Sequence, residues 1–524
     1  MKANRDWDLE TMIEAKKLHA QIITKGLQHQ ETYLRKLITS ILAISNNNSN
    51  YDIKLINYAR IVFDHVGSPS TFTYNTMIKA YSTSPYPRQA LHIYSQMHKL
   101  GIPPDNYTFP FLLKACASLL DLRKGEETHC RVIKHGLGYD VYVHNSLIHF
   151  YGCIGRIDIA YKIFDETGIR DIASWTTLVT CSANIGSLEL ARETFEKMPE
   201  RTAVSFSAMV TAYVRHGRFK EALNMFRDLQ VAGVEPNDST IMGVLCSCAN
   251  LGALDTGRWI HSYVKKQKGT SFDVRITTAL IDMYFKCGSV SNAVDVFAGA
   301  KEKNVAVWTA MIHGMSTHGL GYKSVELFED MVRLGIKPNV VTFVALLSGC
   351  THAGLVDKGL RYYKKMKSEF GIAPTIEHYG CVVDLLGRAG LIREAVEFIN
   401  QMPMQANAAV LGSLLNACRV HRNVEIGEFI MRLLIKEEPL NGALYMSLLS
   451  LYGEACRWDD VKKVKGEMKK VGCRKIPGCS LIEVNGVCYE FISGDKSYQA
   501  ISELCLRLAL LGTAIEEECN ERFF

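Results

Sequence analysis

The chain has 524 residues, and 60 lysines and arginines against 54 aspartates and glutamates give it a formal net charge of +6. This small excess suits a polyanion bound along a defined groove better than a histone-like, purely electrostatic grip, and by itself it fits a mildly basic soluble protein better still. Sixteen cysteines without one C-x-x-C pair exclude a small disulfide framework and give zinc no local support. We expect buried, reduced thiols, as at Cys116, Cys246, Cys350 and Cys418.

The first 70 residues hold one partial and one interrupted helical hairpin. A small residue four positions before a histidine recurs three times, at Ala15/His19, Gly125/His129 and Gly257/His261. Residues 9–30 therefore match only the second half of a hairpin. The polar run at 45–52 predicts a surface loop within the next hairpin. Four acidic residues among the first 14 are unlike a transit peptide, so no targeting segment is visible.

A regular frame of glycine, a small residue and a large apolar residue follows. It recurs at Gly155/Ala160/Phe164, Gly186/Ala191/Phe195, Gly217/Ala222/Phe226, Gly288/Ala293/Phe297, Gly319/Ser324/Phe328 and Gly390/Ala395/Ile399. Successive glycines lie 31, 31, 71, 31 and 71 residues apart. Apolar residues at helical spacing on both sides of each glycine predict a helix, a turn and a second helix. Such a hairpin cannot bury both apolar faces alone, so neighbours must stack on it.

This register divides residues 71–407 into ten units. They are 71–105, 106–140, 141–171, 172–202, 203–237, 238–273, 274–304, 305–339, 340–375 and 376–407. Most carry serine or threonine as their third residue, where we predict the N-cap of the first helix. Several end in Pro-Asp or Pro-Asn, a turn signal. We therefore predict an all-α fold, a right-handed α-solenoid of tandem helix–turn–helix repeats.

The pattern changes towards the C-terminus. Residues 408–441 and 442–475 predict two further helical hairpins of altered sequence. The alternation SLIEV-NG-VCYEFI then predicts a small β-hairpin within 476–496, turning at Asn485-Gly486. A short tail, 497–524, begins with a helical pattern and ends acidic.

Several stretches resemble plant pentatricopeptide repeat (PPR) proteins of the PLS class, E subgroup. They include FTYNTMIKAY, NSLIHFYGCIGRIDIAYKIF, HYGCVVDLLGRAGLIREAVEFI, LLNACRVHRNVEIGE and PGCSLIEVNGVCYEFISGD. The resemblance covers nearly the whole chain. It implies a partial L-type and an interrupted S-type repeat in 1–70, ten P, L and S repeats in 71–407, two E-type hairpins in 408–475 and a PG-box hairpin in 476–496.

In the family that the chain resembles, the fifth residue of a repeat and its last residue together read one RNA base. Carried over by position, the pairs of the P and S units are Asn75/Asp105, Asn145/Asp171, Thr176/Thr202, Ser207/Asn237, Thr278/Asn304 and Thr309/Asn339, and the last unit has Gly380/Asn407. The L units carry Pro110, Met242 and Val344 as fifth residues. The family rule implies uridine over cytidine for Asn/Asp and adenine for Thr/Asn and Ser/Asn, that is, U-n-Y-n-A-n-A-A-n-n from 5′ to 3′. Each pair alone also fits solvated first-turn side chains and helix caps, and only the recurrence favours reading.

The second residue of each repeat forms a further set. The resemblance implies an apolar side chain that wedges between bases, as at Phe72, Tyr107, Val204 and Val341. Arg275 and Glu377 depart from that pattern.

The resemblance further implies a site-recognition factor for C-to-U editing of single-stranded organelle RNA, in mitochondrion or chloroplast with a slight preference for the mitochondrion. Its E region would recruit a deaminase-bearing PPR protein or another editing cofactor. The chain lacks the C-x-x-C ligand pairs of a deaminase domain. We therefore predict no catalytic residue, metal, cofactor, small-molecule substrate or membrane contact, and a framework role for His129, His261 and His378. Two alternatives stay open: a factor for transcript stability, splicing or processing, and a peptide-binding helical scaffold.

Overall fold

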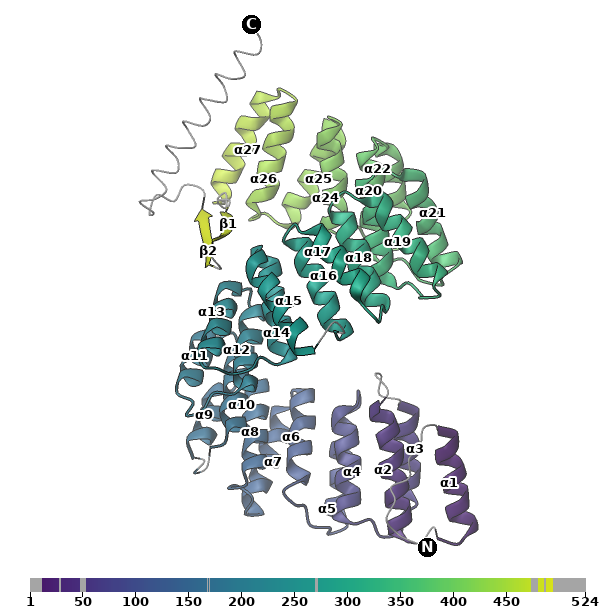
Figure 1. Cartoon of the computed structure of the whole chain (residues 1–524), viewed down its shortest axis with the longest axis vertical. Helices are drawn as coiled ribbons and strands as arrows, with labels where there is room; N and C mark the ends of the chain where they lie inside the picture. The colour runs from purple at the N-terminus through teal and green to yellow at the C-terminus, as the bar shows by residue number, and fades with distance from the viewer. Residues whose placement is uncertain are drawn as a thin grey trace. The chain divides into compact units, whose positions relative to one another are not determined.

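The computed structural model describes residues 12–27, 30–47, 53–166, 168, 170–268, 272–472, 479–484 and 487–492. Within these ranges the chain forms α-helices and one two-stranded sheet (Figure 1). The predicted all-α class with a small C-terminal β-hairpin is confirmed. None of the helices in the described ranges is long and apolar enough to cross a membrane. The chain divides into two compact units, Met1–Thr240 and Ile241–Phe524.

The first compact unit is a stack of helical hairpins. Its helices are α1 (Met12–Thr24), α2 (Glu31–Asn47), α3 (Ile53–Asp64), α4 (Thr71–Thr83), α5 (Arg88–Lys99), α6 (Thr108–Leu119), α7 (Leu122–Lys134), α8 (Val141–Cys153), α9 (Ile157–Glu166), α10 (Ile172–Asn184), α11 (Leu188–Glu196), α12 (Ala203–Arg215) and α13 (Phe219–Val231). The first helices of successive hairpins, α4, α6, α8, α10 and α12, pack each against the next. They form one continuous layer, and α5, α7, α9, α11 and α13 are their second helices.

The second compact unit repeats this arrangement. After α14 (Asp238–Leu251), which spans the division, come α15 (Leu254–Lys268), α16 (Val274–Lys286), α17 (Val290–Gly299), α18 (Val305–Thr317), α19 (Gly321–Arg333), α20 (Val340–His352), α21 (Val356–Ser368), α22 (Ile376–Arg388), α23 (Ile392–Asn400), α24 (Ala408–Val420), α25 (Val424–Glu437), α26 (Gly442–Glu454) and α27 (Trp458–Val471). Here α16, α18, α20, α22 and α24 pack each against the next.

A glycine lies in the turn between the two helices of each predicted hairpin of the frame. Gly288 has φ of 77°, a left-handed conformation that is strained for any residue with a Cβ. Its amide donates to the Phe285 carbonyl at 2.9 Å, and the Ser289 amide donates to the Tyr284 carbonyl at 2.8 Å. The first helix therefore ends at a fixed residue, and the second begins in a fixed direction.

Aromatic contacts hold successive hairpins together. The phenylalanine of the frame meets an aromatic fourth residue of the next unit edge to face, with centroid distances of 4.7 Å for Phe164–Trp175, 5.1 Å for Phe195–Phe206, 4.9 Å for Phe297–Trp308 and 5.3 Å for Phe328–Phe343. Edge-to-face pairs add about 0.5–1.5 kcal/mol each beyond the burial of their area. The frame therefore contributes both the core of one hairpin and its contact with the following one.

The three histidines at recurrent positions bond to tyrosines. His129 Nδ1 lies 3.0 Å from the Tyr151 hydroxyl, and His261 Nδ1 lies 2.8 Å from the Tyr284 hydroxyl, in each case on the first helix of the next hairpin. His19 Nδ1 meets the Tyr58 hydroxyl on α3 at 3.0 Å. Burial lowers the pKa of each of these imidazoles below its usual value. They act as neutral framework groups.

Two predictions made from the sequence need correction or fall partly outside the described ranges. Cys246 is exposed and not buried, because it lies on the solvent side of α14 while Cys248 faces inward. The insertion at 45–52 begins within α2, and residues 48–52 lie outside the described ranges, as does the tail 497–524.

The β-hairpin pairs two short strands. They are β1 (Cys479–Val484) and β2 (Val487–Ile492), antiparallel, with Val484 opposite Val487. This register leaves two residues for the connection, as predicted from the Asn-Gly dipeptide. The turn residues themselves lie outside the described ranges.

The close approach of α16 and α18 gives a test of the stacking. A Cβ added to Gly314 would lie 1.9 Å from the Phe285 ring, so Gly314→Ala should lower the melting temperature, with a cost of about 1–3 kcal/mol. Gly466→Ala is the matched control. Nothing lies within 4 Å of a Cβ at this helical glycine, so alanine should stabilise by up to about 1 kcal/mol. Equal melting temperatures for the two variants would contradict the packing.

The half-buried histidines His19, His129 and His261 predict a pH dependence of stability. Their pKa is lower in the folded chain than the unfolded value of about 6.5, so the unfolded chain binds more protons. The contribution of these groups to stability should therefore be complete well above pH 6.5. It should fall as the pH drops through about 6.5 towards the lower pKa of the folded imidazoles. Melting temperatures measured across this range should show the decrease, and His261→Gln should show a smaller one. A constant melting temperature would rule out neutral imidazoles at these positions.

Candidate nucleic-acid interface

The last residue of most units caps the first helix of the next. Its side-chain oxygen accepts backbone amides of the first turn: Asp105 from Thr108 at 2.9 Å, Asp140 from Tyr142 at 3.0 Å, Asp171 from Ser174 at 2.7 Å, Asn237 from Thr240 at 2.9 Å, Asp273 from Arg275 at 2.9 Å, Asn304 from Ala306 at 3.0 Å, Asn339 from Thr342 at 2.9 Å and Asn407 from Val410 at 3.0 Å. These amides have no partner within the helix, which explains the preference for Asp and Asn.

The predicted N-cap at the third residue is therefore wrong by three positions. In the structure the third residue faces back to the cap as the other half of a capping box. Thr342 is fully buried, and its hydroxyl lies 3.2 Å from the Asn339 amide, which donates to it. Serine and threonine serve both positions, so composition alone does not separate them.

Two of the predicted pairs are joined directly. Asn75 Nδ2 donates to Asp105 Oδ1 at 2.8 Å, and Asn145 Nδ2 donates to Asp171 Oδ1 at 3.2 Å. A third pair is joined through one hydroxyl, because Thr309 and Asn339 both bond to Thr342, at 2.7 and 2.9 Å. Since a carboxylate only accepts, the amide orientations of Asn75 and Asn145 follow from chemistry.

The other pairs are not joined in this way. The hydroxyls of Thr176 and Thr278 donate to the carbonyls of Ile172 and Val274, each at 2.7 Å, one turn back in the same helix. Ser207 is buried, and Asn237 Nδ2 donates to the Ala203 carbonyl at 3.4 Å. Gly380 has no side chain to pair with Asn407.

Thr202 is the predicted base-reading partner of Thr176. It stands at the N-cap of α12, where its amide donates to the Ser205 hydroxyl at 3.0 Å. Its own hydroxyl oxygen is buried and has no hydrogen-bond partner within the described ranges. The Thr176 hydroxyl donates to the Ile172 carbonyl, so the two hydroxyls of this pair are not joined to each other. The reading role of Thr202 stays a prediction.

The Asp171 carboxylate is stabilised in its charged form. Burial by itself raises its pKa, but hydrogen bonds from the Ser174 hydroxyl and amide and from Asn145 outweigh burial and hold the pKa below its usual value. The carboxylate thus remains a hydrogen-bond acceptor at neutral pH.

The linker before each cap is anchored in the short units. Arg170, which precedes Asp171, lies over the Phe164 ring at 4.8 Å and donates to the Phe164 and Asp165 carbonyls, both at 3.1 Å. Arg201 and Lys303 lie in the same way over Phe195 and Phe297, at 5.2 and 5.3 Å. The inter-hairpin aromatic contact therefore also fixes the position of the last residue.

Apolar second residues stand beside the pairs. Phe72 is 56% exposed, Tyr107 64%, Val204 60% and Val341 59%. Each of these exposed fractions is far above that of a core side chain. Sequence reasoning missed Tyr142, which is 73% exposed and occupies the same second position. Its position as the second residue of unit 141–171 would have been enough to identify it. Arg275 departs from the set, and its guanidinium pairs with Asp273 at 2.9 Å.

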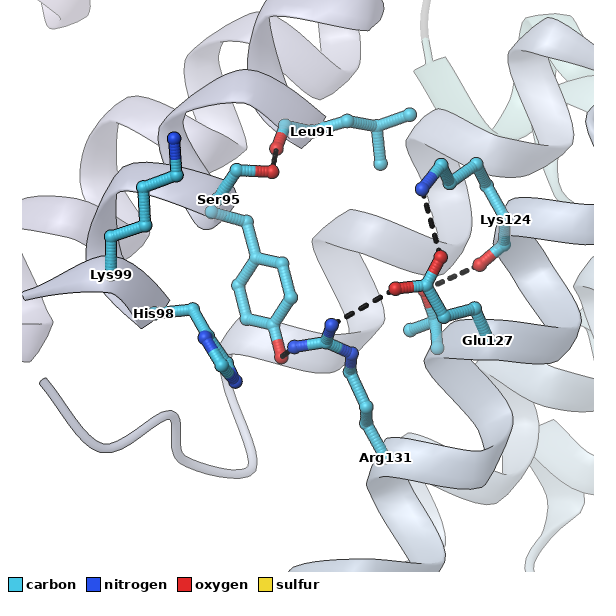
Figure 2. Close-up of a pocket in the computed structure, with 9 residues that line it drawn as sticks. Leu91, Ser95, His98, Lys99, Lys124, Glu127 and Arg131 are labelled. Carbon is cyan, nitrogen blue, oxygen red and sulfur yellow. Dashed lines mark hydrogen bonds and ion pairs between the residues drawn. The ribbon is translucent and has the colours of Figure 1, made fainter. Parts of the chain in front are cut away.

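Side chains on the second helices form a separate pocket. A cavity of about 240 Å³ lies between α5 and α7, and Figure 2 shows residues that line it. Glu127 accepts from Lys124 at 2.8 Å and from Arg131 at 2.9 Å. The Lys124 hydrogen bond is the main cause that lowers the pKa of Glu127. The Arg131 guanidinium also lies over the Tyr94 ring, 5.4 Å from its centroid. These charges compensate one another, away from the paired residues.

Groups that could suggest a metal centre belong to the framework. In the described ranges no cluster of three or more His, Cys, Asp or Glu side chains could hold a metal ion. One H-x-E triplet occurs in the sequence, at 29–31, and Glu31 accepts from the Ser70 amide at 2.8 Å and the Thr73 hydroxyl at 2.7 Å. His378 is fully buried, and its Nε2 lies 3.0 Å from the Val340 carbonyl oxygen.

The stacked hairpins and the recurrent polar pairs define an α-solenoid repeat protein. Family models agree with this description: the PPR repeat family matches 69–118, 201–250 and 303–352, the PPR repeat matches 142–167, 173–202, 276–305, 341–369 and 377–405, and the E motif matches 421–483.

Similar proteins are named for the same repeat. One pentatricopeptide repeat-containing protein of Arabidopsis thaliana is 40% identical over 504 residues, which cover 96% of this chain and 80% of the relative. Another from that plant, named as chloroplastic/mitochondrial, is 38% identical over a match that covers 95% of this chain and 75% of the relative. The crystal structure of maize PPR10 matches the fold with a TM-score of 0.51 at 16% identity, over 88% of this chain and 71% of that one. The chain belongs to the pentatricopeptide repeat family, and the E motif places it in the E subgroup of the PLS class.

Proposed function

We propose that this protein binds single-stranded RNA in a sequence-specific manner and marks sites of C-to-U editing in an organelle. The observation that carries the proposal is the recurrence of one polar fifth residue beside one capping last residue along the layer of first helices. Structural capping alone needs only the last residue. It does not account for polar fifth residues held beside it.

Capping fixes which atoms remain for a base. Asn304 uses Oδ1 to accept the Ala306 and Val307 amides, at 3.0 and 3.2 Å, so its Nδ2 is directed elsewhere as a donor. Adenine presents an acceptor at N1, whereas guanine presents N1–H. A donor at the last position therefore favours adenine over guanine.

In the Asn/Asp pairs we expect an acceptor, and not a donor, to face the base. Asn145 Oδ1 is buried and has no hydrogen-bond partner in the described part of the chain. Uracil carries a donor at N3–H, and cytosine has an acceptor at the same atom. An acceptor that faces N3 of a pyrimidine therefore favours uridine over cytidine. This supports the predicted preference for uridine.

A switch of one pair tests base reading. Thr278→Asn with Asn304→Asp keeps a capping oxygen, so the fold should be retained, as a melting curve would show. The preference for adenine at one nucleotide should move towards uridine by roughly five- to tenfold in the ratio of dissociation constants, the size of one or two hydrogen bonds. The measurement compares two RNAs that differ only at that nucleotide. An unchanged adenine preference in a folded variant would reject the assignment of this pair.

The E region supports an editing role over a role in transcript stability, splicing or processing. The E motif matches 421–483, and α25 exposes Phe429 by 66% and Leu433 by 43%, one turn apart. These side chains lie outside the repeat core and are available for contact with another protein. We assign them to contact with a deaminase supplied in trans. Relatives named as chloroplastic or mitochondrial favour an organelle as the location.

Editing in a plant that lacks this protein tests the proposal. One or a few cytidines should lose editing, and the wild-type chain should restore it. Phe429→Ser with Leu433→Ser should bind the RNA with unchanged affinity but restore little or no editing. Loss of transcript processing with all editing intact would instead favour the processing alternative. A chain without RNA affinity at low salt would favour the peptide scaffold.

A further inference from the structure

We propose that the third residue of a following repeat is an additional specificity-determining position, and that Thr108 and Thr342 hold the fifth residue of the preceding repeat in its reading orientation. The inference rests on the proposed RNA-reading function. It concerns positioning residues, which act on the base through Asn75 and Thr309.

The first site is a closed triangle of three side chains. The Thr108 hydroxyl lies 2.7 Å from Asn75 Oδ1 and 2.9 Å from Asp105 Oδ1, while Asn75 Nδ2 donates to Asp105 at 2.8 Å. Thr108 is fully buried and Asn75 is 7% exposed. Thr108 has one hydroxyl proton, and Asn75 Oδ1 is the nearer of its two acceptors. With that proton donated to Asn75, both polar atoms of the carboxamide have a partner. The amide cannot rotate without breaking two hydrogen bonds.

The second site repeats the arrangement with a hydroxyl in place of the amide. Thr342 bonds to Thr309 at 2.7 Å and to Asn339 Oδ1 at 2.9 Å, and it also accepts from the Asn339 amide at 3.2 Å. Since Asn339 Oδ1 has only lone pairs to offer, the Thr342 proton goes to it. The Thr309 hydroxyl must then be the donor to Thr342. Its rotation is fixed by the neighbouring repeat.

The Asn145/Asp171 pair supplies the contrast. Its third residue is Ser174, whose hydroxyl donates to Asp171 at 2.7 Å and leaves Asn145 Oδ1 without a partner. Asn145 is thus held at one atom and Asn75 at two. The same Asn/Asp pair should therefore discriminate uridine from other bases more sharply at Asn75 than at Asn145, because a pinned amide cannot turn to accept a mismatched edge.

The test measures dissociation constants for four RNAs that differ only at the nucleotide assigned to Asn75 and Asp105. Thr108→Val keeps the shape and removes the hydroxyl, and it should reduce the preference for uridine by about three- to tenfold, the size of one hydrogen bond. Thr108→Ser restores the hydroxyl and should restore most of the preference. Thr73→Val is the matched control. It removes an equally buried third-position hydroxyl whose partner is Glu31, so it should leave this preference unchanged.

Two further outcomes are decisive. Asn75→Thr with Asp105→Asn, measured on the same RNAs, should move the preference from uridine to adenine. If that switch occurs and Thr108→Val discriminates as well as wild type, the positioning role is wrong and base reading stands. If the switch fails in a folded protein, the reading function itself is wrong. An equal loss for Thr108→Val and Thr73→Val would reduce Thr108 to a stability role.

Discussion

The backbone amides at the start of each first helix need an acceptor that the helix cannot supply, and the rest of the repeat is arranged around that need. In most repeats, from Asp105 to Asn407, an aspartate or asparagine at the end of the preceding repeat supplies this acceptor. Because the capping oxygen is committed, the remaining atom of the same side chain has a defined direction and polarity. A requirement of helix formation thus yields a donor or an acceptor at a regular spacing. Thr202 differs from the aspartates and asparagines, because its side chain has only one polar atom.

Packing keeps these atoms at a constant pitch. The edge-to-face contacts between neighbouring hairpins fix the distance from one first helix to the next, and Arg170 and Arg201 bind the same phenylalanines from the linker side. Histidine–tyrosine hydrogen bonds at His129 and His261 add a polar contact between hairpins at other positions. Base reading by a modular array depends on this pitch, since each nucleotide must meet the next pair in register.

The helical hairpins and their glycine turns could be predicted because the apolar spacing around Gly288 and its equivalents has a single structural solution. The cap could not be placed correctly, because serine and threonine are common at both the N-cap and the third position of a capping box. The hydrogen-bond partner of the fifth residue could also not be predicted from the sequence. A threonine hydroxyl can bond back within its helix, as at Thr278, or across to the next repeat, as at Thr309, and the two choices differ little in energy. Cys246 illustrates the same limit for burial, since it is exposed although Leu245 and Ser247 on either side of it are buried.

The central claim is that a polar pair in a repeat reads one base in a fixed order. Selection of bound sequences from a random single-stranded RNA pool tests it most directly. The account predicts one enriched motif with uridine first, a pyrimidine two nucleotides later, and adenines at the fifth, seventh and eighth positions, as assigned to Asn75 through Thr309. A pool without enrichment, or a motif whose spacing does not match the repeats, would contradict it.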